Sequence, residues 1–361
     1  MNLIELGYTK QHEQYRLENN LQSFQIGRVV AEHKERYVVR TEEGDYEAEI
    51  TGNLRFTARN REDFPAVGDW VALTVFDADF SVIHRIFPRF STISRQAVGK
   101  FAEKQVIAAN IDYALLVQAI DRDFNINRLE RYLTICYTSK VSPIIVLTKT
   151  DLASQQRVSE IIGSIKTRIK NIKVVAVSNE TQNGCEPLIQ IMESGKTYCL
   201  LGSSGVGKST LLNTLLGSTQ MKTGSVSEST SKGRHVTSHR ELVVLPSGGI
   251  IIDNPGMREV GIADASAGME STFDMIYQLS RSCKYNDCTH TSEVGCSVVE
   301  AVEKGEIDRE TYENYLKMEK EREHFDLSVR EKRLKDKQFG KMVKNFKKDI
   351  KGISSKNKGD Y

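Results

Sequence analysis

The 361-residue chain has no apolar run that approaches the 18 or more residues a membrane-spanning helix needs. Its opening residues, MNLIELGYTKQHEQ, lack the character of a secretory signal peptide. A strong net charge is missing too, because 50 Lys and Arg almost balance 48 Asp and Glu. The first two absences disfavour a membrane protein, so we expect a cytoplasmic protein with no membrane partner. The near balance of charge means that a role in binding a polyanion cannot rest on the charge of the whole chain. No coiled-coil pattern argues for a dimer, so we expect a monomer.

The charge is uneven along the chain. From Glu331 to the end, eleven Lys and Arg stand against four Asp and Glu, which makes this tail basic. Apolar residues recur in the tail at helical spacing, namely Phe339, Met342, Phe346 and Ile350. A helix that packs one face on a core and leaves a basic face in solvent explains this pattern. Contact with RNA phosphates explains it equally well.

The six cysteines do not form a disulfide pattern in a chain of this length. Three of them stand alone, at Cys136, Cys185 and Cys199. The other three lie close to one histidine, in the group Cys283, Cys288, His290 and Cys296. Three thiolates and one imidazole make a closed tetrahedral set for one structural Zn²⁺, with no position left for a catalytic water. Free buried thiols in a reducing cytosol are the alternative.

The composition, with 39% hydrophobic residues, is that of a globular protein of two or three domains. Residues 24–90 read as short strands separated by turns, which predicts a small barrel or sandwich, with an oligonucleotide-binding (OB) type barrel as one option. Such a barrel could contact RNA or serve for packing alone. Trp70, the only tryptophan, lies inside a strand pattern, so we expect it in the core.

From residue 111, apolar runs alternate with helical patterns. The runs are DYALLVQAI, SPIIVLTK, KVVAVS and KTYCLLG, and such runs are typical of parallel strands buried on both faces. The segment HRELVVLPSGGIIIDNPG predicts a hairpin that turns at Ser-Gly-Gly. We therefore expect three domains: a barrel in residues 1–95, an α/β domain in 96–262, and a helical domain in 263–361.

A phosphate-binding loop follows the strand pattern TYCLL and opens the helix pattern STLLNTLL. Its glycines let backbone N–H groups converge on phosphate oxygens at the positive end of a helix dipole. Lys208 is expected to reach the β- and γ-phosphates, and the Ser209 hydroxyl to bind Mg²⁺. The residues expected around the nucleotide phosphates are Gly202, Ser203, Ser204, Gly205, Val206, Gly207, Lys208, Ser209 and Thr210.

The tetrapeptide that starts at Asp253 follows the buried run GIII. Its carboxylate is placed for a second Mg²⁺ contact, and the N–H of Gly256 for the γ-phosphate. A DxxG tetrapeptide by itself also occurs as an ordinary turn. It indicates a nucleotide site here only because a phosphate loop precedes it.

Another buried strand ends at the tetrapeptide Thr148, Lys149, Thr150 and Asp151. A carboxylate at Asp151 can accept hydrogen bonds from N1–H and the 2-amino group of guanine, which adenine lacks, while the Lys149 stem packs on the base. The alternative is a strand-end turn in which Asp151 caps a helix. Ser178, in the run AVSN, is expected in a supporting loop under the base.

The long polar segment TGSVSESTSKGRH follows the phosphate loop and is expected to act as a switch that orders on binding GTP and Mg²⁺. The motifs therefore occur in the order base loop, supporting loop, phosphate loop, switch, DxxG, which is a cyclic rotation of the usual GTPase order. A rotated chain keeps the same sheet if the original ends lie close together. The chain then leaves the domain just after the segment that senses the γ-phosphate. The C-terminal part of the chain is therefore tied to the nucleotide state.

The sequence resembles the circularly permuted, ribosome-associated GTPases of the RsgA family. The resemblance rests on VGDWV, EKQVIAANID, TKTDL, GSSGVGKSTLLN, GRHVTSHREL, DNPGMREVG and the Cys/His group. It implies a circularly permuted P-loop GTPase domain, an N-terminal OB barrel and a C-terminal zinc-binding domain. It also implies binding of GTP/GDP with Mg²⁺, a role in late maturation of the small (30S) ribosomal subunit, and binding of its rRNA, which favours the RNA interpretation of the basic tail.

Two departures from the family pattern concern the site. Thr148 stands where GTPases usually carry Asn, which is expected to weaken one contact that bridges two loops. The switch reads His-Val-Thr-Ser-His, which makes Thr237 the expected Mg²⁺ ligand there.

Met257 replaces the glutamine that positions water in many GTPases, so turnover without a partner is expected to be slow. His235, His239 or the subunit could supply the missing group, although each histidine could equally be an exposed loop residue.

Two other functions remain open on the residues alone. A small-molecule kinase would use the same phosphate loop but needs an acceptor pocket and a lid, for which no motif is present. A zinc-containing RNA-binding protein without enzymatic activity would bind nucleotide and not turn it over. The expected function is a GTPase that binds the small ribosomal subunit, with the nucleotide timing its release.

Overall fold

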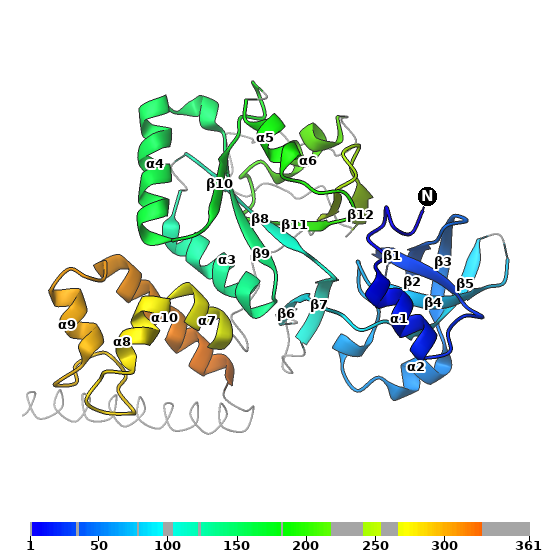
Figure 1. The fold of residues 1–361 in the computed structure, drawn as a ribbon, viewed down its shortest axis with the longest axis horizontal. Helices are drawn as coiled ribbons and strands as arrows, with labels where there is room; N and C mark the ends of the chain where they lie inside the picture. The colour runs from blue at the N-terminus through cyan, green and yellow to red at the C-terminus, as the bar shows by residue number, and fades with distance from the viewer. Residues whose placement is uncertain are drawn as a thin grey trace, which may run out of the picture.

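The computed structural model describes residues 2–33, 36–77, 79–96, 104–121, 124–181, 183–217, 241–253 and 266–326. Three bodies follow one another across the molecule (Figure 1): a barrel, a central sheet with helices, and a helical domain. None of the helices in these residues is long and apolar enough to cross a membrane.

The N-terminal body is a closed five-stranded barrel. Its strands are β1 (Gln25–His33), β2 (Arg36–Arg40), β3 (Asp45–Ile50), β4 (Trp70–Val75) and β5 (Phe80–Ile86). Strand β1 pairs with both β2 and β4, and β3 pairs in parallel with β5, which closes the barrel. This confirms the predicted barrel and is consistent with an OB fold. Trp70 is buried, as predicted.

Short elements surround the barrel. They are α1 (Lys10–Glu18), α2 (Gly52–Thr57) and the 3-10 turn η1 (Arg61–Asp63). A separate two-stranded sheet of β6 (Thr92–Gln96) and β7 (Lys104–Ala109) leads from the barrel into the next body.

The central body is a mainly parallel sheet in the order β10-β9-β8-β11-β13-β12. Its strands are β8 (Tyr113–Ala119), β9 (Ser142–Thr148), β10 (Lys173–Ala176), β11 (Thr197–Leu201), β12 (Glu241–Val244) and β13 (Ile250–Asp253). The four apolar runs are parallel neighbours, as predicted, and β12 and β13 form the predicted hairpin.

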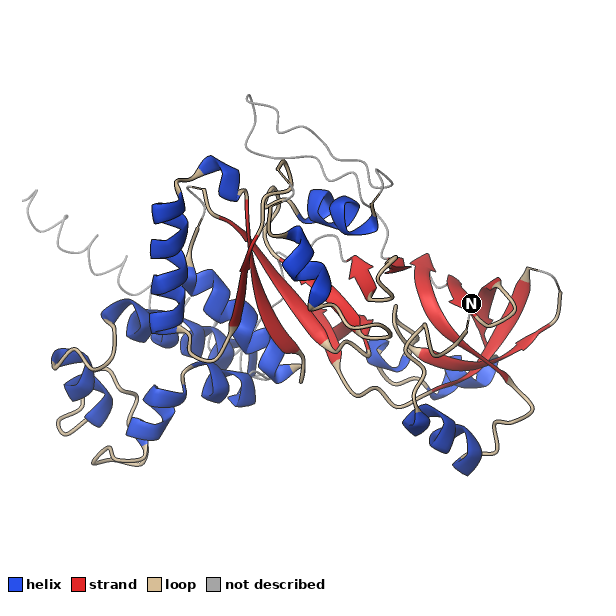
Figure 2. Ribbon diagram, turned by 45° about the horizontal axis from the view of Figure 1, so that its top comes forward, coloured by secondary structure: helices blue, strands red, loops and turns tan. Residues whose placement is uncertain are grey.

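Helices cover both faces of this sheet (Figure 2). One face packs on α3 (Ile126–Thr138) and α4 (Gln155–Arg168), and the other on α5 (Cys185–Gln190) and α6 (Lys208–Leu216). The 3-10 turn η2 (Thr150–Leu152) follows β9. With both faces covered, the strands must be apolar throughout, which explains their uninterrupted hydrophobic runs.

The barrel and the central sheet share hydrogen bonds, because β1 also pairs with β12. Arg28 on β1 lies fully buried at this junction. Its guanidinium donates to the carbonyls of Leu6, Gly68 and Asn110 and to the Thr197 hydroxyl at the start of β11. A buried cation needs such partners, so this side chain fixes the barrel against the strand that leads to the phosphate loop.

The C-terminal body consists of α7 (Ser266–Thr272), α8 (Asp274–Ser280), α9 (Ser297–Glu303) and α10 (Arg309–Asp326). Its small core includes Met269, Phe273, Ile276, Val298 and Met318. The Cys/His group lies in the loop between α8 and α9. Helices therefore dominate this region, as the sequence predicts.

Candidate nucleotide and metal sites

The phosphate loop lies between β11 and α6, in the context that its motif requires. Gly207 is the N-cap of α6 and has φ of 91°, in the left-handed region that favours glycine. A Cβ on Gly202 would stand 2.3 Å from the carbonyl oxygen of Val117, so no side chain fits there. These two glycines let the backbone of the loop turn tightly beside the end of the strand.

Lys208 folds back over the loop. Its ammonium donates to the carbonyl oxygens of Gly202 and Ser203, at 2.8 and 2.7 Å. The cation therefore already stands above the backbone that would surround a phosphate. A phosphate group is a stronger acceptor for an ammonium than these neutral carbonyls are.

Asp253 ends β13 beside this loop and is 6% exposed. One of its oxygens, Oδ2, is buried and has no hydrogen-bond partner among the described residues. Burial raises the pKa of this carboxyl, and the Lys208 charge partly opposes that rise. A buried carboxylate oxygen without a partner is the kind of ligand that Mg²⁺ would satisfy, so the residues present fit the ion.

The predicted base loop lies next to the phosphate loop. The Thr148 hydroxyl donates a hydrogen bond of 2.6 Å to the carbonyl oxygen of Val206. Lys149 has φ of 59°, and its ammonium lies 2.9 Å from a carboxylate oxygen of Asp121. Thr148 therefore bridges the two loops despite being a threonine, and Asp121 holds the lysine whose stem is expected to pack on the base.

Asp151 is exposed at the same end of the sheet. Its Oδ1 accepts a hydrogen bond of 2.6 Å from the Ser178 hydroxyl, and that hydroxyl also accepts from the backbone N–H of Thr181. Ser178, predicted as a residue of the supporting loop, therefore orients the carboxylate that is expected to read guanine.

The sequence reasoning missed Asp121, and it placed Asn179 only as the last residue of the supporting-loop run AVSN, without predicting its contact. Asp121 follows the buried run of β8, so the rule that polar residues at parallel strand ends converge on one edge could have found it. Asn179 directly follows Ser178, and its carboxamide lies against Gly207. No local pattern marks Asn179.

Several expected site residues lie outside the described residues. These are Gly256, the switch residues His235, Thr237 and His239, and Met257. The apolar stripe of the basic tail also lies outside them. Their roles remain predictions.

The four predicted metal ligands come together in the C-terminal body. Their ligand atoms all lie within 4.8 Å of one another. Cys283 Sγ is 3.9 Å from Cys296 Sγ and 3.6 Å from His290 Nδ1. Sulfurs bound at about 2.3 Å to a tetrahedral Zn²⁺ stand about 3.8 Å apart. The donor set and its spacing therefore fit Zn²⁺.

Comparison with known proteins identifies the family. A model of the RsgA GTPase matches residues 86–263. A protein of Bacteroides thetaiotaomicron named small ribosomal subunit biogenesis GTPase RsgA 1 is 39% identical, over 89% of this chain and 90% of its own length. This chain belongs to the RsgA GTPase family.

Other relatives carry the same kind of name. The small ribosomal subunit biogenesis GTPase RsgA 2 of Lactiplantibacillus plantarum is 39% identical, over 92% of both chains. The RsgA 1 of Oceanobacillus iheyensis is 42% identical, over 82% of this chain and 84% of its own. An ABC transporter model also matches residues 190–344, a stretch that includes the phosphate loop. That loop is common to many nucleotide-binding proteins, so it does not distinguish them.

Two solved structures share the fold of this RsgA family member. The crystal structure of YjeQ from Thermotoga maritima superposes with a TM-score of 0.60 at 24% identity, covering 81% of this chain and 96% of that one. YloQ, described as a circularly permuted GTPase, gives a TM-score of 0.58 at 24% identity, covering 84% and 97%. The predicted permuted GTPase fold is thereby confirmed.

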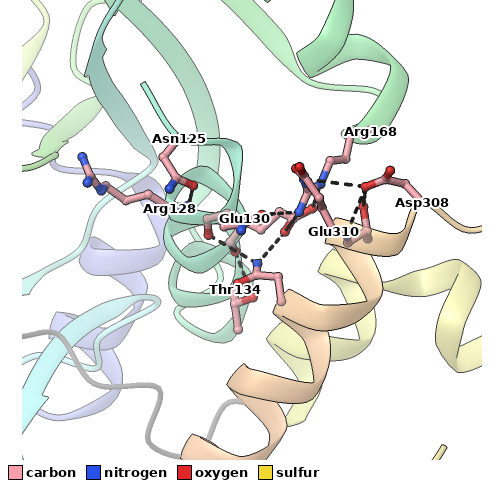
Figure 3. Close-up of polar contacts among 10 residues, drawn as sticks. Asn125, Arg128, Glu130, Thr134, Arg168, Asp308 and Glu310 are labelled. Carbon is pink, nitrogen blue, oxygen red and sulfur yellow. Dashed lines mark hydrogen bonds and ion pairs between the residues drawn. The ribbon is translucent and has the colours of Figure 1, made fainter. Parts of the chain in front are cut away.

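A polar network joins the GTPase domain of this family member to its C-terminal body (Figure 3). Glu130 on α3 is almost fully buried, and its two carboxylate oxygens accept from Nε and Nη2 of Arg168 on α4, at 2.7 and 2.9 Å. Asn314 on α10 donates to the same carboxylate. Nearby, Arg131 on α3 pairs with Glu321 on α10 at 2.6 Å. Helix α10 is therefore fixed to α3 and α4, the two helices that follow the strands ending at the base site.

Proposed function

We propose that this protein is a GTPase that binds the small (30S) ribosomal subunit during its late maturation and hydrolyses GTP to time its own release. The observation that carries this proposal is the meeting of base loop, supporting loop and phosphate loop at one end of the sheet in permuted order. Membership of the RsgA GTPase family, whose relatives are named for small-subunit biogenesis, supports it.

The nucleotide is assigned to the edge of the sheet where β9, β11 and β13 end. The backbone of residues 202–210 would surround the phosphates, Lys208 would neutralise them, and Asp151 would accept from guanine. Ser209 and Asp253 would hold Mg²⁺, which supplies charge neutralisation to the developing phosphate oxygens. The residues at 235, 237, 239 and 256 complete this assignment as the switch and the γ-phosphate sensor.

A structural Zn²⁺ is assigned to the group Cys283, Cys288, His290 and Cys296. Four protein ligands leave no position for a substrate or a water, so the ion would act on folding and not on catalysis. Its support is the spacing of the donors in a body whose apolar core is small.

The barrel, the metal-binding body and the basic tail are proposed as the parts that contact ribosomal RNA. The barrel and the metal-binding body lie on opposite sides of the GTPase domain (Figure 1), which suits a protein that spans a large RNA surface. The protein is proposed to act in the cytoplasm, where its proposed partner, the small ribosomal subunit, matures. It is also proposed to act as a monomer. RNA contact through phosphates should weaken as the salt concentration rises.

The test is hydrolysis of GTP and of ATP by the purified protein, alone and with isolated small ribosomal subunits. We expect slow turnover of GTP alone, a steep rise with subunits, and little use of ATP. Equal use of ATP would contradict the guanine site and favour a kinase-like enzyme. Nucleotide binding without turnover, even with subunits, would favour a non-enzymatic RNA-binding protein.

A further inference from the structure

Both residues of the base loop that are expected to touch guanine are held by a side chain that follows a neighbouring strand. Asp151 accepts a hydrogen bond from Ser178, which follows β10. The ammonium of Lys149 lies 2.9 Å from Oδ2 of Asp121, which follows β8. Ser178 thereby orients a short carboxylate, and Asp121 orients a cation on a long, flexible stem.

The backbone brings Asp121 and Lys149 together. Strands β8 and β9 are paired as far as Ala119 and Thr148, and the N–H of Ile120 donates to the carbonyl oxygen of Thr148 at 3.0 Å. The residues that come next, Asp121 and Lys149, therefore lie side by side at this edge of the sheet. Lys149 has φ of 59°, a strained conformation for a residue with a side chain, and such strain is concentrated at functional sites.

The ion pair restricts the side chain of Lys149 from its far end. A four-carbon stem must lose rotamer freedom before it can pack flat on a base. The two side chains are 31% and 32% exposed, so water screens their charges and the pair contributes little to the stability of the fold. Its effect falls on binding, because a side chain that is already ordered loses less freedom when the ligand arrives.

We propose that Asp121 is a positioning residue for the nucleotide, which orders the stem of Lys149 for packing on the face of guanine before the nucleotide binds. This inference rests on the proposed guanine site. It assigns to Asp121 a contribution to nucleotide affinity that acts through Lys149 and not through contact with the nucleotide.

The test is a double-mutant cycle on the full chain, with GDP affinity as the measurement. We expect Asp121→Asn to weaken GDP binding about fivefold, which is the effect of ordering one flexible side chain. Lys149→Met keeps an apolar stem and removes the ammonium, so it should weaken binding by a similar factor. Adding Asp121→Asn to Lys149→Met should then change the affinity by less than about twofold, because the cation that Asp121 holds is already gone.

Asp112→Asn is the matched control. Asp112 directly precedes β8, at the end of the strand opposite to Asp121, and it pairs with Lys196 at 2.8 Å. The control therefore removes an equivalent ion pair from the other edge of the same sheet. It should leave the affinity for GDP unchanged.

The same loss from Asp121→Asn in the native chain and in Lys149→Met would overturn the proposal, because Asp121 would then act on the loop and not on Lys149. An unchanged affinity in Asp121→Asn would overturn it too. So would native affinity in Lys149→Met, even if the Asp121 variants failed to fold. A native chain that binds no GDP, or binds ADP as well as GDP, would instead contradict the guanine site itself, so the two failures are distinguishable.

Discussion

The Thr148 hydroxyl donates a hydrogen bond of 2.6 Å to the carbonyl oxygen of Val206, which ties the base loop to the phosphate loop. These residues lie 58 positions apart in the chain. On sequence grounds, a threonine in place of asparagine is expected to weaken this bridge. The structure shows a short bond made from a fully buried side chain, so the bridge itself is retained.

Replacing Thr148 with valine keeps the volume of the side chain and removes the bridging hydroxyl. We expect the affinities for GDP and GTP to fall together by about tenfold, because the carbonyl of Val206 loses its buried donor. Thr148→Ser should retain most of the affinity. Thr167→Val, which removes an exposed hydroxyl bond within α4, is the control. Titration with a fluorescent GDP would measure all three, and an unchanged affinity in Thr148→Val would show that the bridge is dispensable.

Replacing Asp151 with asparagine tests the reading of guanine. We expect GDP affinity to fall by about a hundredfold or more, because two charge-assisted hydrogen bonds are lost. Xanthosine diphosphate should bind the variant better than the native chain, because its 2-carbonyl oxygen can accept from the new amide. Competition between the two nucleotides would measure this exchange. A loss of affinity for both nucleotides alike would point to damage of the loop and not to base recognition.

Removing the metal should unfold the C-terminal body and spare the nucleotide site. We expect about one Zn²⁺ per chain in the purified protein, lost in Cys296→Ser and retained in Cys185→Ala. Chelation should lower the helical circular dichroism while GDP still binds, because the two sites lie in different bodies. Metal analysis, circular dichroism and GDP binding together would show whether the ion is structural. Full helicity in the metal-free protein would exclude a structural role for the ion.

The buried pair of Arg168 and Glu130 should matter more to stability than exposed pairs do. In Arg168→Met the Glu130 carboxylate stays buried without its charged partner, so we expect a loss of about 3 kcal/mol. The double variant Arg168→Met/Glu130→Gln should regain part of that loss. Arg281→Met, which breaks an exposed pair with Glu270, should change stability by less than about 1 kcal/mol. Chemical denaturation would measure the series, and equal losses for Arg168 and Arg281 would contradict the prediction.

His12 should make the barrel region sensitive to acid. Burial, with the nearby Arg28 charge, lowers its pKa from 6.5 to about 4, and its Nδ1 accepts the N–H of Thr9. Between these two pH values the unfolded chain binds a proton that the folded chain does not. Stability is therefore fully present above about pH 6.5 and is lost as the pH falls toward 4, by at most about 1.4 kcal/mol per pH unit.

Urea unfolding at pH 7 and pH 5 would measure this loss in the native chain and in His12→Gln. The variant should show a shallower dependence on pH over this interval. A native chain and a variant with the same pH dependence would show that His12 does not titrate in this way.

Much of the fold follows from local patterns. The buried runs that became β8, β9, β10 and β11 are uninterrupted because both faces of their sheet are covered by helices. The hairpin of β12 and β13 turns at a Ser-Gly-Gly segment, where Gly248 has φ of 86°. The pairing of β1 with β12, which joins the barrel to the sheet, follows from no such pattern. It depends on how two complete domains dock.

The candidate site also combines features that follow from local sequence with contacts that depend on the tertiary structure. The amino-acid sequence by itself determined the phosphate loop, the base motif and the metal ligands, because each of these functions depends on closely spaced residues and on local backbone geometry. Only the tertiary structure decided that Asp121 holds Lys149, that Thr148 reaches Val206, and that Asn179 lies beneath Gly207. These contacts join loops that are distant in sequence, and the order of the strands in the sheet is what brings the loops together.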